Sequence, residues 1–356
     1  MDDPVDIEIS TSKTNPRAGR RTPWFGAGCG ARVILTAAAA TIALSEIAAR
    51  MEETMSMLKK ATLSSALVPL LILSGCHSVH KTDMKVMTFN ILYNSHKVFS
   101  GDTSWEVRRP LLITCLKAYA PDLLGTQESF EFQTDAILDA FPSWRVFGKG
   151  RYHQVLAVSP RRPYEDLGGE SCRVLYDQSK YILPDHGTFW HSDLPDSAGS
   201  RTWGNELPRV VTWGKFQIRD GGKKFVVMNT HFHWDQPYVQ NTAHLIMRKW
   251  REISQGLPTI LMGDFNLAPD SPAHELFCGR SGPKELAGEF RDCWQVLNKP
   301  ETGAGTGHAF TGKGVTRIDW ILVTEEFTVK SIEILYDNAN GIYPSDHFPV
   351  LAGLAL

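Results

Sequence analysis

Short polar runs beside apolar segments constrain this chain more than any other feature. Residues 263–266 read Gly-Asp-Phe-Asn and follow the apolar run 258–262, and residues 345–350 read Ser-Asp-His-Phe-Pro-Val before an apolar carboxyl terminus. Because strand side chains alternate between two faces, we expect Asp264 and Asn266 to point the same way. Buried polar groups are costly unless partners satisfy them. The pattern therefore predicts a polar site at the ends of buried strands, where a bound metal and a phosphate would satisfy these groups.

The amino-terminal region carries a pattern typical of export. Residues 57–60 form a short basic start, residues 61–72 are mostly apolar, and residues 73–76 read Leu-Ser-Gly-Cys. The apolar run is shorter than the roughly 20 residues that span a bilayer. Residues 57–76 resemble a bacterial lipoprotein signal peptide, with Cys76 as the lipidated residue. The alternative is a buried helix with an incidental cysteine.

Residues 1–56 precede that segment and are rich in Ala, Arg and Gly. We interpret them as an upstream extension, either disordered or the product of a mis-assigned start codon. The 281 residues after position 75 fit one large domain, which we expect over 84–356.

Charge and cysteine usage exclude some classes of protein. From Cys76 onward the chain has 29 Lys and Arg and 32 Asp and Glu, a net charge of −3 with His neutral. Sequence-independent DNA binding relies on an excess of Lys and Arg, which this composition does not provide. No Cys-x-x-Cys or Cys/His zinc spacing occurs, so no structural zinc site is expected. Cys278 and Cys293 would either pair in an oxidising compartment or remain two separate thiols.

Hydrophobic periodicity predicts more strands than helices. The helices are expected at 105–120, 130–141 and 238–254, where apolar residues recur at helical spacing. The strands are expected at 85–90, 122–126, 173–176, 210–218, 225–230, 258–264, 318–323 and 329–335, with a hairpin turn at 220–222. Two mixed sheets packed face to face with helices outside, an α+β sandwich, suit this order.

Polar residues recur at the predicted strand ends throughout the chain. Carboxylates at converging strand ends would hold a hard divalent cation, and imidazoles and amides would bind or protonate phosphoryl oxygens. Mg²⁺ prefers few carboxylates together with water and phosphate ligands, so this set suits Mg²⁺ better than zinc. The residues are Asn90, Glu128, Asn229, His231, Asp264, Asn266, Asp319, Asp346 and His347.

The order and wording of these blocks resemble the endonuclease/exonuclease/phosphatase superfamily, which includes DNase I-like nucleases, deadenylases, inositol-polyphosphate phosphatases and neutral sphingomyelinases. The resemblance implies a four-layered sandwich and metal-assisted cleavage of a phosphoester. The matching blocks are 88–90, 125–128, 229–231, 263–266, 317–319 and 345–350.

The resemblance also implies roles for individual residues. Glu128 would be the principal ligand of the metal, with Asn90 beside it and Asp346 near the metal. The metal would be Mg²⁺, with Mn²⁺ as a possible substitute. Asp264 would activate the attacking water, and Asn266 would hold the nucleophile or a phosphoryl oxygen. His347 would be oriented by Asp319. His231 and Asn229 would stabilise negative charge. Glu170 and Arg209 would contact the substrate.

We therefore expect a Mg²⁺-dependent phosphoric ester hydrolase, a phosphodiesterase, nuclease or phosphatase acting by in-line attack of water. The expected setting is the bacterial cell envelope, with a monomer held to the membrane by its lipid and facing the periplasm or exterior. The sequence leaves open whether the substrate is a small molecule, a nucleic acid or a lipid. The alternative is a catalytically silent lipoprotein that binds phosphorylated ligands.

Overall fold

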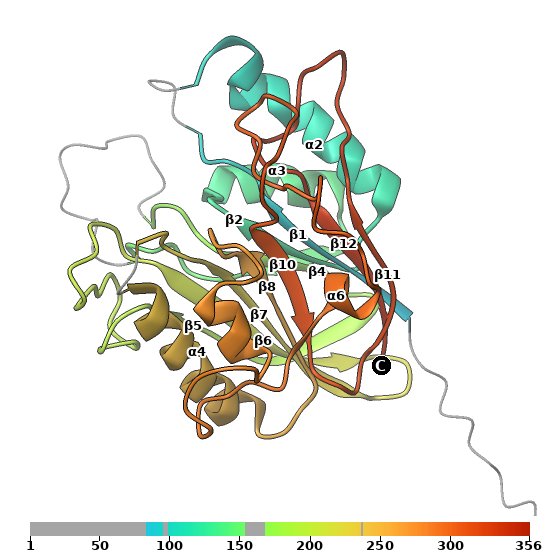
Figure 1. Ribbon diagram of the computed structural model, residues 1–356. Coiled ribbons are helices and arrows are strands. Elements are labelled where there is room, and N and C mark those ends of the chain that lie inside the picture. The colour runs from blue at the N-terminus through green and yellow to red at the C-terminus, as the bar shows by residue number, and fades with distance from the viewer. Residues whose placement is uncertain (1–82, 95–98, 154–167, 236–237) are drawn as a thin grey trace, which may run out of the picture. The chain divides into compact units, whose positions relative to one another are not determined.

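Two six-stranded sheets lie face to face at the centre of the described part of the chain (Figure 1). This computed structural model describes residues 83–94, 99–153, 168–235 and 238–356. The first sheet has the order β11-β12-β1-β2-β4-β3 and consists of β1 (Asp83–Asn90), β2 (Leu123–Gln127), β3 (Trp144–Phe147), β4 (Val174–Asp177), β11 (Thr328–Ile334) and β12 (Val350–Ala355). The second has the order β5-β6-β7-β8-β10-β9 and consists of β5 (Tyr181–Trp190), β6 (Val210–Ile218), β7 (Lys224–His231), β8 (Thr259–Asp264), β9 (Arg291–Asp292) and β10 (Asp319–Val323).

Helices cover the outer faces of the sheets and complete four layers (Figure 1). Apolar residues of α2 (Trp105–Tyr119) and α3 (Glu131–Ala140) share a core with β1, β2 and β4. Those of α4 (Tyr238–Ser254) and α5 (Pro272–Phe277) share a core with β7, β8 and β10. Two short elements, η1 (Gly101–Thr103) and α6 (Cys293–Val296), lie in connections. The expected α/β sandwich is confirmed.

Alternation along β1 shows why both faces of the sheets are buried. Met84 and Val86 belong to the core between the two sheets, whereas Met87 and Phe89 pack against the helices. Burying each such side chain contributes roughly 1.5–3 kcal/mol. Asn90 ends the strand and shares the parity of Met84 and Val86, so the chain directs its amide between the sheets.

Strand direction brings the site residues to one end of the sandwich. β1 and β2 run parallel, as do β7 and β8, so their carboxyl ends lie together. In the registers, His231 lies beside Asp264, and Asp264 lies opposite Asp319 of the antiparallel β10. A hydrogen bond from Asn90 Nδ2 to Asp264 Oδ2 (2.9 Å) joins this end of one sheet to the same end of the other.

The predicted helices and strands are present, and the structure also contains elements that the sequence did not predict. The periodicity does not predict β3, β5 or α5. Cys278 and Cys293 are free thiols. The predicted extension over 1–56 and the predicted signal peptide over 57–76, with Cys76, lie outside the described residues. Within the described ranges, no helix has the length and apolarity needed to span a membrane.

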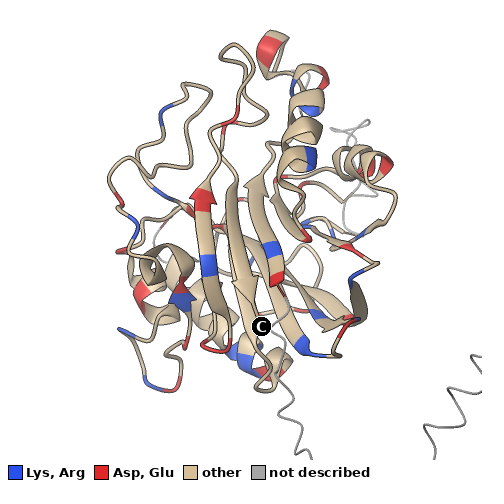
Figure 2. Cartoon of the chain, turned by 90° about the vertical axis from the view of Figure 1, so that its right-hand side faces the viewer, with Lys and Arg blue, Asp and Glu red and all other residues tan. Residues whose placement is uncertain are grey.

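Charged residues of both signs are interspersed over the molecule. On the side shown in Figure 2, Lys and Arg alternate with Asp and Glu along the strands and helices. This distribution agrees with the near-neutral composition and gives this side no continuous basic stripe of the kind that binds a nucleic-acid backbone.

Candidate active site

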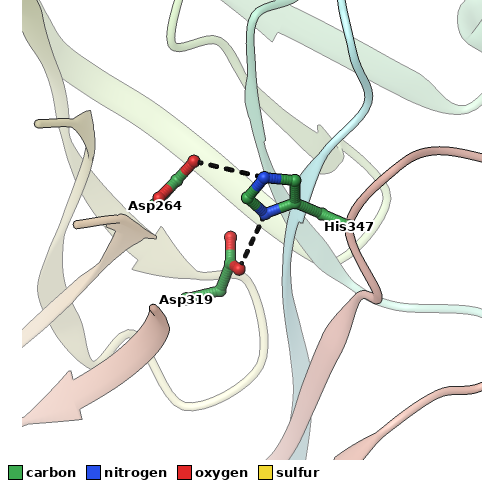
Figure 3. Close-up of side chains that lie close together, drawn as sticks. All are labelled: Asp264, Asp319 and His347. Atoms are coloured by element: carbon green, nitrogen blue, oxygen red, sulfur yellow. Dashed lines mark hydrogen bonds and ion pairs between the residues drawn. The ribbon is translucent and has the colours of Figure 1, made fainter. Parts of the chain in front are cut away.

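His347 lies between two carboxylates of the second sheet (Figure 3). Its Nδ1 is 2.9 Å from Asp319 Oδ2, and its Nε2 is 3.8 Å from Asp264 Oδ2. Burial alone would lower the pKa of His347, but the charges of Asp319 and Asp264 outweigh it and raise the pKa well above the usual value. The raised pKa favours the protonated ring, whose Nδ1–H donates to Asp319 while Nε2 faces Asp264 at ion-pair distance.

Asp264 contacts Asn90, Asn266 and His231 at the centre of the site. It is fully buried, its Oδ1 accepts from the Asn266 backbone N–H (2.9 Å) and its Oδ2 accepts from Asn90 Nδ2 (2.9 Å). Burial and the neighbouring charge of Asp319 raise the pKa of Asp264 to about 6. A carboxylate with a pKa in this range, held by two donors, suits a general base.

Glu128 is the second raised carboxyl group. Its Oε1 accepts from Asn90 Nδ2 (3.1 Å) and its Oε2 from the Tyr93 backbone N–H (3.4 Å). Burial, Glu170 and Asp346 together raise the pKa of Glu128 to about 7. Three acidic groups thus crowd one another on this side of the site.

Asn90 lies between Glu128 and Asp264 and presents its amide NH₂ to both carboxylates. Its Oδ1 accepts from the Leu92 backbone N–H (3.1 Å). We had expected Asn90 beside the metal. In this hydrogen-bond network the amide orients the two carboxylates, and its oxygen is already engaged.

The backbone is strained at the ends of the two central strands that carry acidic groups. Glu128 (φ 57°) and Asn266 (φ 52°) both adopt the left-handed region. Such a conformation costs a non-glycine residue of order 1–3 kcal/mol and persists where surrounding structure holds it. Here it turns Glu128 and Asn266 out of their strand paths toward the site, a feature that sequence periodicity does not reveal.

His231 is neutral and is held by its neighbours. Its Nδ1 lies 2.7 Å from Arg209 Nη1, and its Nε2 lies 3.4 Å from Asp264 Oδ2 and 3.0 Å from Asn266 Nδ2. Burial, Arg209 and His347 hold the pKa of His231 well below its usual value. Because a guanidinium only donates, Nδ1 accepts from Arg209, while Nε2 faces both the Asp264 carboxylate and the Asn266 amide nitrogen.

The two expected substrate contacts lie together beside His231. Glu170 and Arg209 line a small pocket, with Arg209 Nη1 3.9 Å from Glu170 Oε2. Arg151, to which sequence reasoning assigned no role, lines the same pocket and forms a bidentate ion pair with Glu170.

The structure does not place Asn229 among the groups that could stabilise negative charge at the site. Its Oδ1 accepts from Gln127 Nε2 (2.7 Å), and its Nδ2 donates to the carbonyls of Thr126 and Arg173 (both 2.9 Å). Asn229 shares the inward face of His231, as parity predicts, but lies two residues deeper. Its amide is fully used in joining the two sheets.

Arg108 is a buried cation that sequence reasoning missed. Its guanidinium donates to the carbonyls of Ile91 (2.7 Å), Leu92 (3.2 Å) and Pro344 (3.1 Å). Burial lowers the pKa of Arg108 to about 10, against the opposing charges of Asp346 and Glu128. Arg108 therefore fixes the segment after β1 to the segment before Asp346.

Comparisons with known proteins identify the family. The model of the "Endonuclease/Exonuclease/phosphatase family" matches residues 87–347, which is most of the chain and contains five of the six matching blocks in full and the start of the sixth, 345–350. The chain belongs to this family. Its members include nucleases and phosphatases, so hydrolysis of a phosphoric ester is the chemistry that the family implies.

Solved structures of family members have the same fold. An endonuclease/exonuclease/phosphatase from Bacteroides vulgatus is 30% identical, with a TM-score of 0.65 over 78% of this chain and 100% of that one. A mannosyl-6-phosphatase from Bacteroides thetaiotaomicron is 28% identical, with a TM-score of 0.64 over 77% of this chain and 100% of that one.

Curated relatives match less of the chain. An uncharacterised protein of Acanthamoeba polyphaga mimivirus is 27% identical over 187 residues, which is 51% of this chain and 67% of that protein. The chain spans only 32% of the CCR4-Not complex 3'-5'-exoribonuclease subunit Ccr4 of Aspergillus niger. The activities of these larger proteins are therefore not carried over whole.

Enzymes of this family typically use divalent metals, and the acidic residues here fit one. Asp264, Asp319 and His347 place one potential ligand atom each within 4.8 Å of one another, but the imidazolium already bridges the two carboxylates. Burial and the charges of Glu170 and Asp346 instead raise the pKa of Glu128, against the opposing effects of the Asn90 hydrogen bond and the His347 charge. A divalent cation bound by Glu128 and Asp346 would relieve that repulsion.

Proposed function

We propose that this protein is a Mg²⁺-dependent phosphoric ester hydrolase that cleaves its substrate by in-line attack of water on phosphorus. The observation that carries the proposal is the position of Asp264, a carboxylate of raised pKa placed directly beside the His347 imidazolium. One group accepts a proton and its neighbour supplies positive charge, the two requirements of a hydrolytic attack on a phosphoryl group.

Each residue has a defined task in this mechanism. Asp264 takes the proton of the attacking water, and the Asn90 and Asn266 donors keep its oxygens aimed at that water. The His347 imidazolium, held by Asp319, stabilises the negative charge that grows on a phosphoryl oxygen. His231 lies on the other side of Asp264, with its Nε2 3.4 Å from Oδ2.

Metal chemistry completes the reaction. Glu128 and Asp346 would hold the Mg²⁺, with Mn²⁺ as a substitute. Bound there, a divalent cation would supply positive charge that offsets the charge on the leaving ester oxygen.

Turnover of the full chain on p-nitrophenyl phosphate and on bis-(p-nitrophenyl) phosphate tests the proposal. Activity should vanish with EDTA, return with Mg²⁺, and be lost in the His347→Ala variant. Asp185→Asn is a matched control, because this exposed strand residue makes only a 3.4 Å ion pair with Lys215. If neither ester nor a panel of DNA, RNA and phospholipid is hydrolysed, the hydrolase proposal fails and ligand binding without turnover replaces it.

We also propose that the mature protein is anchored by a lipid on Cys76 and acts outside the cytoplasm of a bacterium. The basic start, short apolar run and Leu-Ser-Gly-Cys ending support this setting. Metabolic labelling with palmitate in a bacterial host should mark the wild type and not Cys76→Ala. Equal labelling of both would overturn the proposal.

A further inference from the structure

A short segment outside the site residues described above, residues 306–309, lies against the pair of Asp319 and His347 (Figure 3). The segment forms an isolated antiparallel bridge with His347. One residue further along, the backbone N–H of Phe348 donates to the Thr306 carbonyl (2.9 Å). The segment is therefore bonded to the backbone that carries the imidazole.

The side chain of Thr306 holds the other member of the pair. Thr306 is fully buried, and its Oγ1 accepts from the backbone N–H groups of Ile318 (3.0 Å) and Asp319 (3.2 Å). In the described sheet, β9 pairs with Leu322 and Val323 of β10 and does not extend to Asp319. The hydroxyl thus takes the place of a neighbouring strand at this edge, where an unpaired buried N–H would cost free energy.

The backbone of Thr306 is itself fixed against the segment that leads into β10. Its N–H donates to the Thr316 carbonyl (3.0 Å). Two glycines permit this approach, because a Cβ on Gly305 would lie 2.0 Å from the carbonyl carbon of Gly314, and one on Gly314 would lie 2.3 Å from that of Gly305. The hydroxyl of Thr306 is therefore presented to β10 from a fixed position.

We propose that Thr306 is a positioning residue, whose hydroxyl fixes Asp319 at the start of β10 so that its carboxylate meets the His347 imidazole. The proposal rests on the hydrolase function proposed above. Thr306 acts through Asp319, and the contact that it preserves is the 2.9 Å hydrogen bond from His347 Nδ1 to Asp319 Oδ2. Because a misplacement of about 1 Å can cost roughly 10²-fold in rate, loss of this hydroxyl should lower kcat and leave KM nearly unchanged.

The first test compares Thr306→Val with wild type in the full chain with Mg²⁺, on p-nitrophenyl phosphate and bis-(p-nitrophenyl) phosphate. Valine keeps the shape of the side chain and removes the hydroxyl. On the ester that wild type hydrolyses, kcat should fall about 10–100-fold, with KM within about 3-fold of wild type. Thr306→Ser restores the hydroxyl and should recover most of the lost kcat. An unchanged kcat in Thr306→Val, or a loss that Thr306→Ser does not recover, would overturn the proposal.

A second buried threonine provides the matched control. Thr324 follows β10 at its opposite end, and its Oγ1 accepts from the Thr259 backbone N–H (2.9 Å). Thr324→Val removes a comparable hydrogen bond away from the site, so it should lower the melting temperature and leave kcat unchanged. An equal fall of kcat in Thr306→Val and Thr324→Val would assign the effect to folding and overturn the positioning role.

A second pair of variants applies if Thr306→Val does not fold. Thr306→Ser and Thr306→Ala both lack the methyl group and differ only in the hydroxyl. The serine variant should have the higher kcat. Equal kcat values in these two variants would overturn the proposal.

Proton NMR of the full chain at fixed pH gives a readout that does not require turnover. A histidine N–H that donates to a carboxylate resonates far downfield, and absence from His347→Gln identifies the His347 signal. The pair of His274 Nε2 and Asp292 Oδ2 (2.9 Å) supplies an internal reference, because His274 Nδ1 accepts from Arg280 and leaves the proton on Nε2.

The His347 signal should shift or disappear in Thr306→Val and remain in Thr306→Ser, while the His274 signal stays in place in both. An unshifted His347 signal in Thr306→Val would overturn the positioning role. If wild type hydrolyses no ester and its His347 signal still depends on the Thr306 hydroxyl, the hydrolase function fails and the positioning of Asp319 by Thr306 stands.

Discussion

The 2.9 Å contact between His347 Nδ1 and Asp319 Oδ2 joins the two sheets at their catalytic end. Asp319 is the first residue of β10 in the second sheet, and His347 lies three residues before β12 of the first. The contact therefore forms only when the two sheets are packed together as in the folded protein. Its formation thus depends on the packing of the two sheets.

Replacing Asp319 with Asn should lower kcat about 10²–10⁴-fold, the range typical for losing a positioned acid–base group. The neutral amide leaves His347 without its main counter-charge, so the pKa of the ring falls and it loses its positive charge near neutral pH. The measurement is kcat across pH 5–9 with saturating Mg²⁺.

The pH profile distinguishes this role from a structural one. In the variant, the pH optimum should move to lower pH because the weakened imidazolium forms only there, until protonation of the base Asp264, with a pKa of about 6, limits the rate. A variant with the same profile as wild type and a uniform loss would show that Asp319 acts through folding alone.

Glu128→Gln should abolish metal-dependent activity and yet stabilise the metal-free protein at pH 8. The folded-state pKa of Glu128 is raised to about 7 by burial, Glu170 and Asp346, above a value near 4.3 in the unfolded chain. The folded state therefore binds more protons between these pH values, so stability falls as pH rises from about 4.5 to about 7.

Thermal melts of both proteins in EDTA check this prediction at pH 5 and pH 8. The variant should exceed wild type in Tm at pH 8, and the gap should narrow at pH 5, where folded Glu128 is protonated. An equal gap at both pH values would contradict the raised pKa. Adding Mg²⁺ at pH 8 should stabilise wild type more than the variant.

Arg108→Met should destabilise the fold by about 2–4 kcal/mol, because the carbonyls of Ile91, Leu92 and Pro344 lose a charged donor while remaining buried. Urea unfolding measures the change, and Arg109→Met on the exposed side of α2 is the control. A change below 0.5 kcal/mol would show that water replaces the guanidinium.

Sequence periodicity and motif spacing were enough to predict the sandwich and to place most of the expected site residues at strand ends. Asp264, Asp319 and His347 lie in runs that adjoin long apolar strands, so their position at strand ends follows from the sequence. The contact of His231 with Asp264 follows from the parallel pairing of β7 and β8, which the strand order alone did not reveal.

Other parts of the site depend on tertiary contacts. Arg108 and Arg151 lie in segments without a motif, and each acquires its role from partners brought near by folding. Strand alternation predicts correctly that Asn229 points between the sheets. Only the packed structure shows that its amide forms hydrogen bonds with Gln127 and Thr126 of the opposite sheet.

The missed strand β5 has a local cause. Its sequence contains Pro184 and Gly187, and its register with β6 shifts between Ile182 and Asp185. Proline and glycine within a run indicate a turn in a sequence analysis, but an edge strand tolerates both because one side needs no hydrogen-bond partner.

A last prediction concerns a charged cluster outside the catalytic groups. Asp292 Oδ2 lies 2.7 Å from Arg317 Nη2 and 2.9 Å from His274 Nε2, and all three side chains are buried. Burial alone would raise the pKa of Asp292, but the hydrogen bond from His274 and the charge of Arg317 outweigh it and lower the pKa. Asp292→Asn should therefore cost about 1–3 kcal/mol at pH 7, since Arg317 loses this partner but keeps Glu301 2.7 Å from its Nη2.

The pH dependence of that loss identifies its origin. Because the folded-state pKa is depressed, the contribution of Asp292 is fully present above its unfolded pKa of about 3.9 and disappears as pH falls through the folded value. Urea unfolding at pH 7 and pH 3 should thus show a smaller difference between wild type and variant at pH 3. Glu326→Gln, an exposed site, should differ from wild type at neither pH. A difference that does not shrink in acid would assign the loss to the geometry of the amide and not to the charge of Asp292.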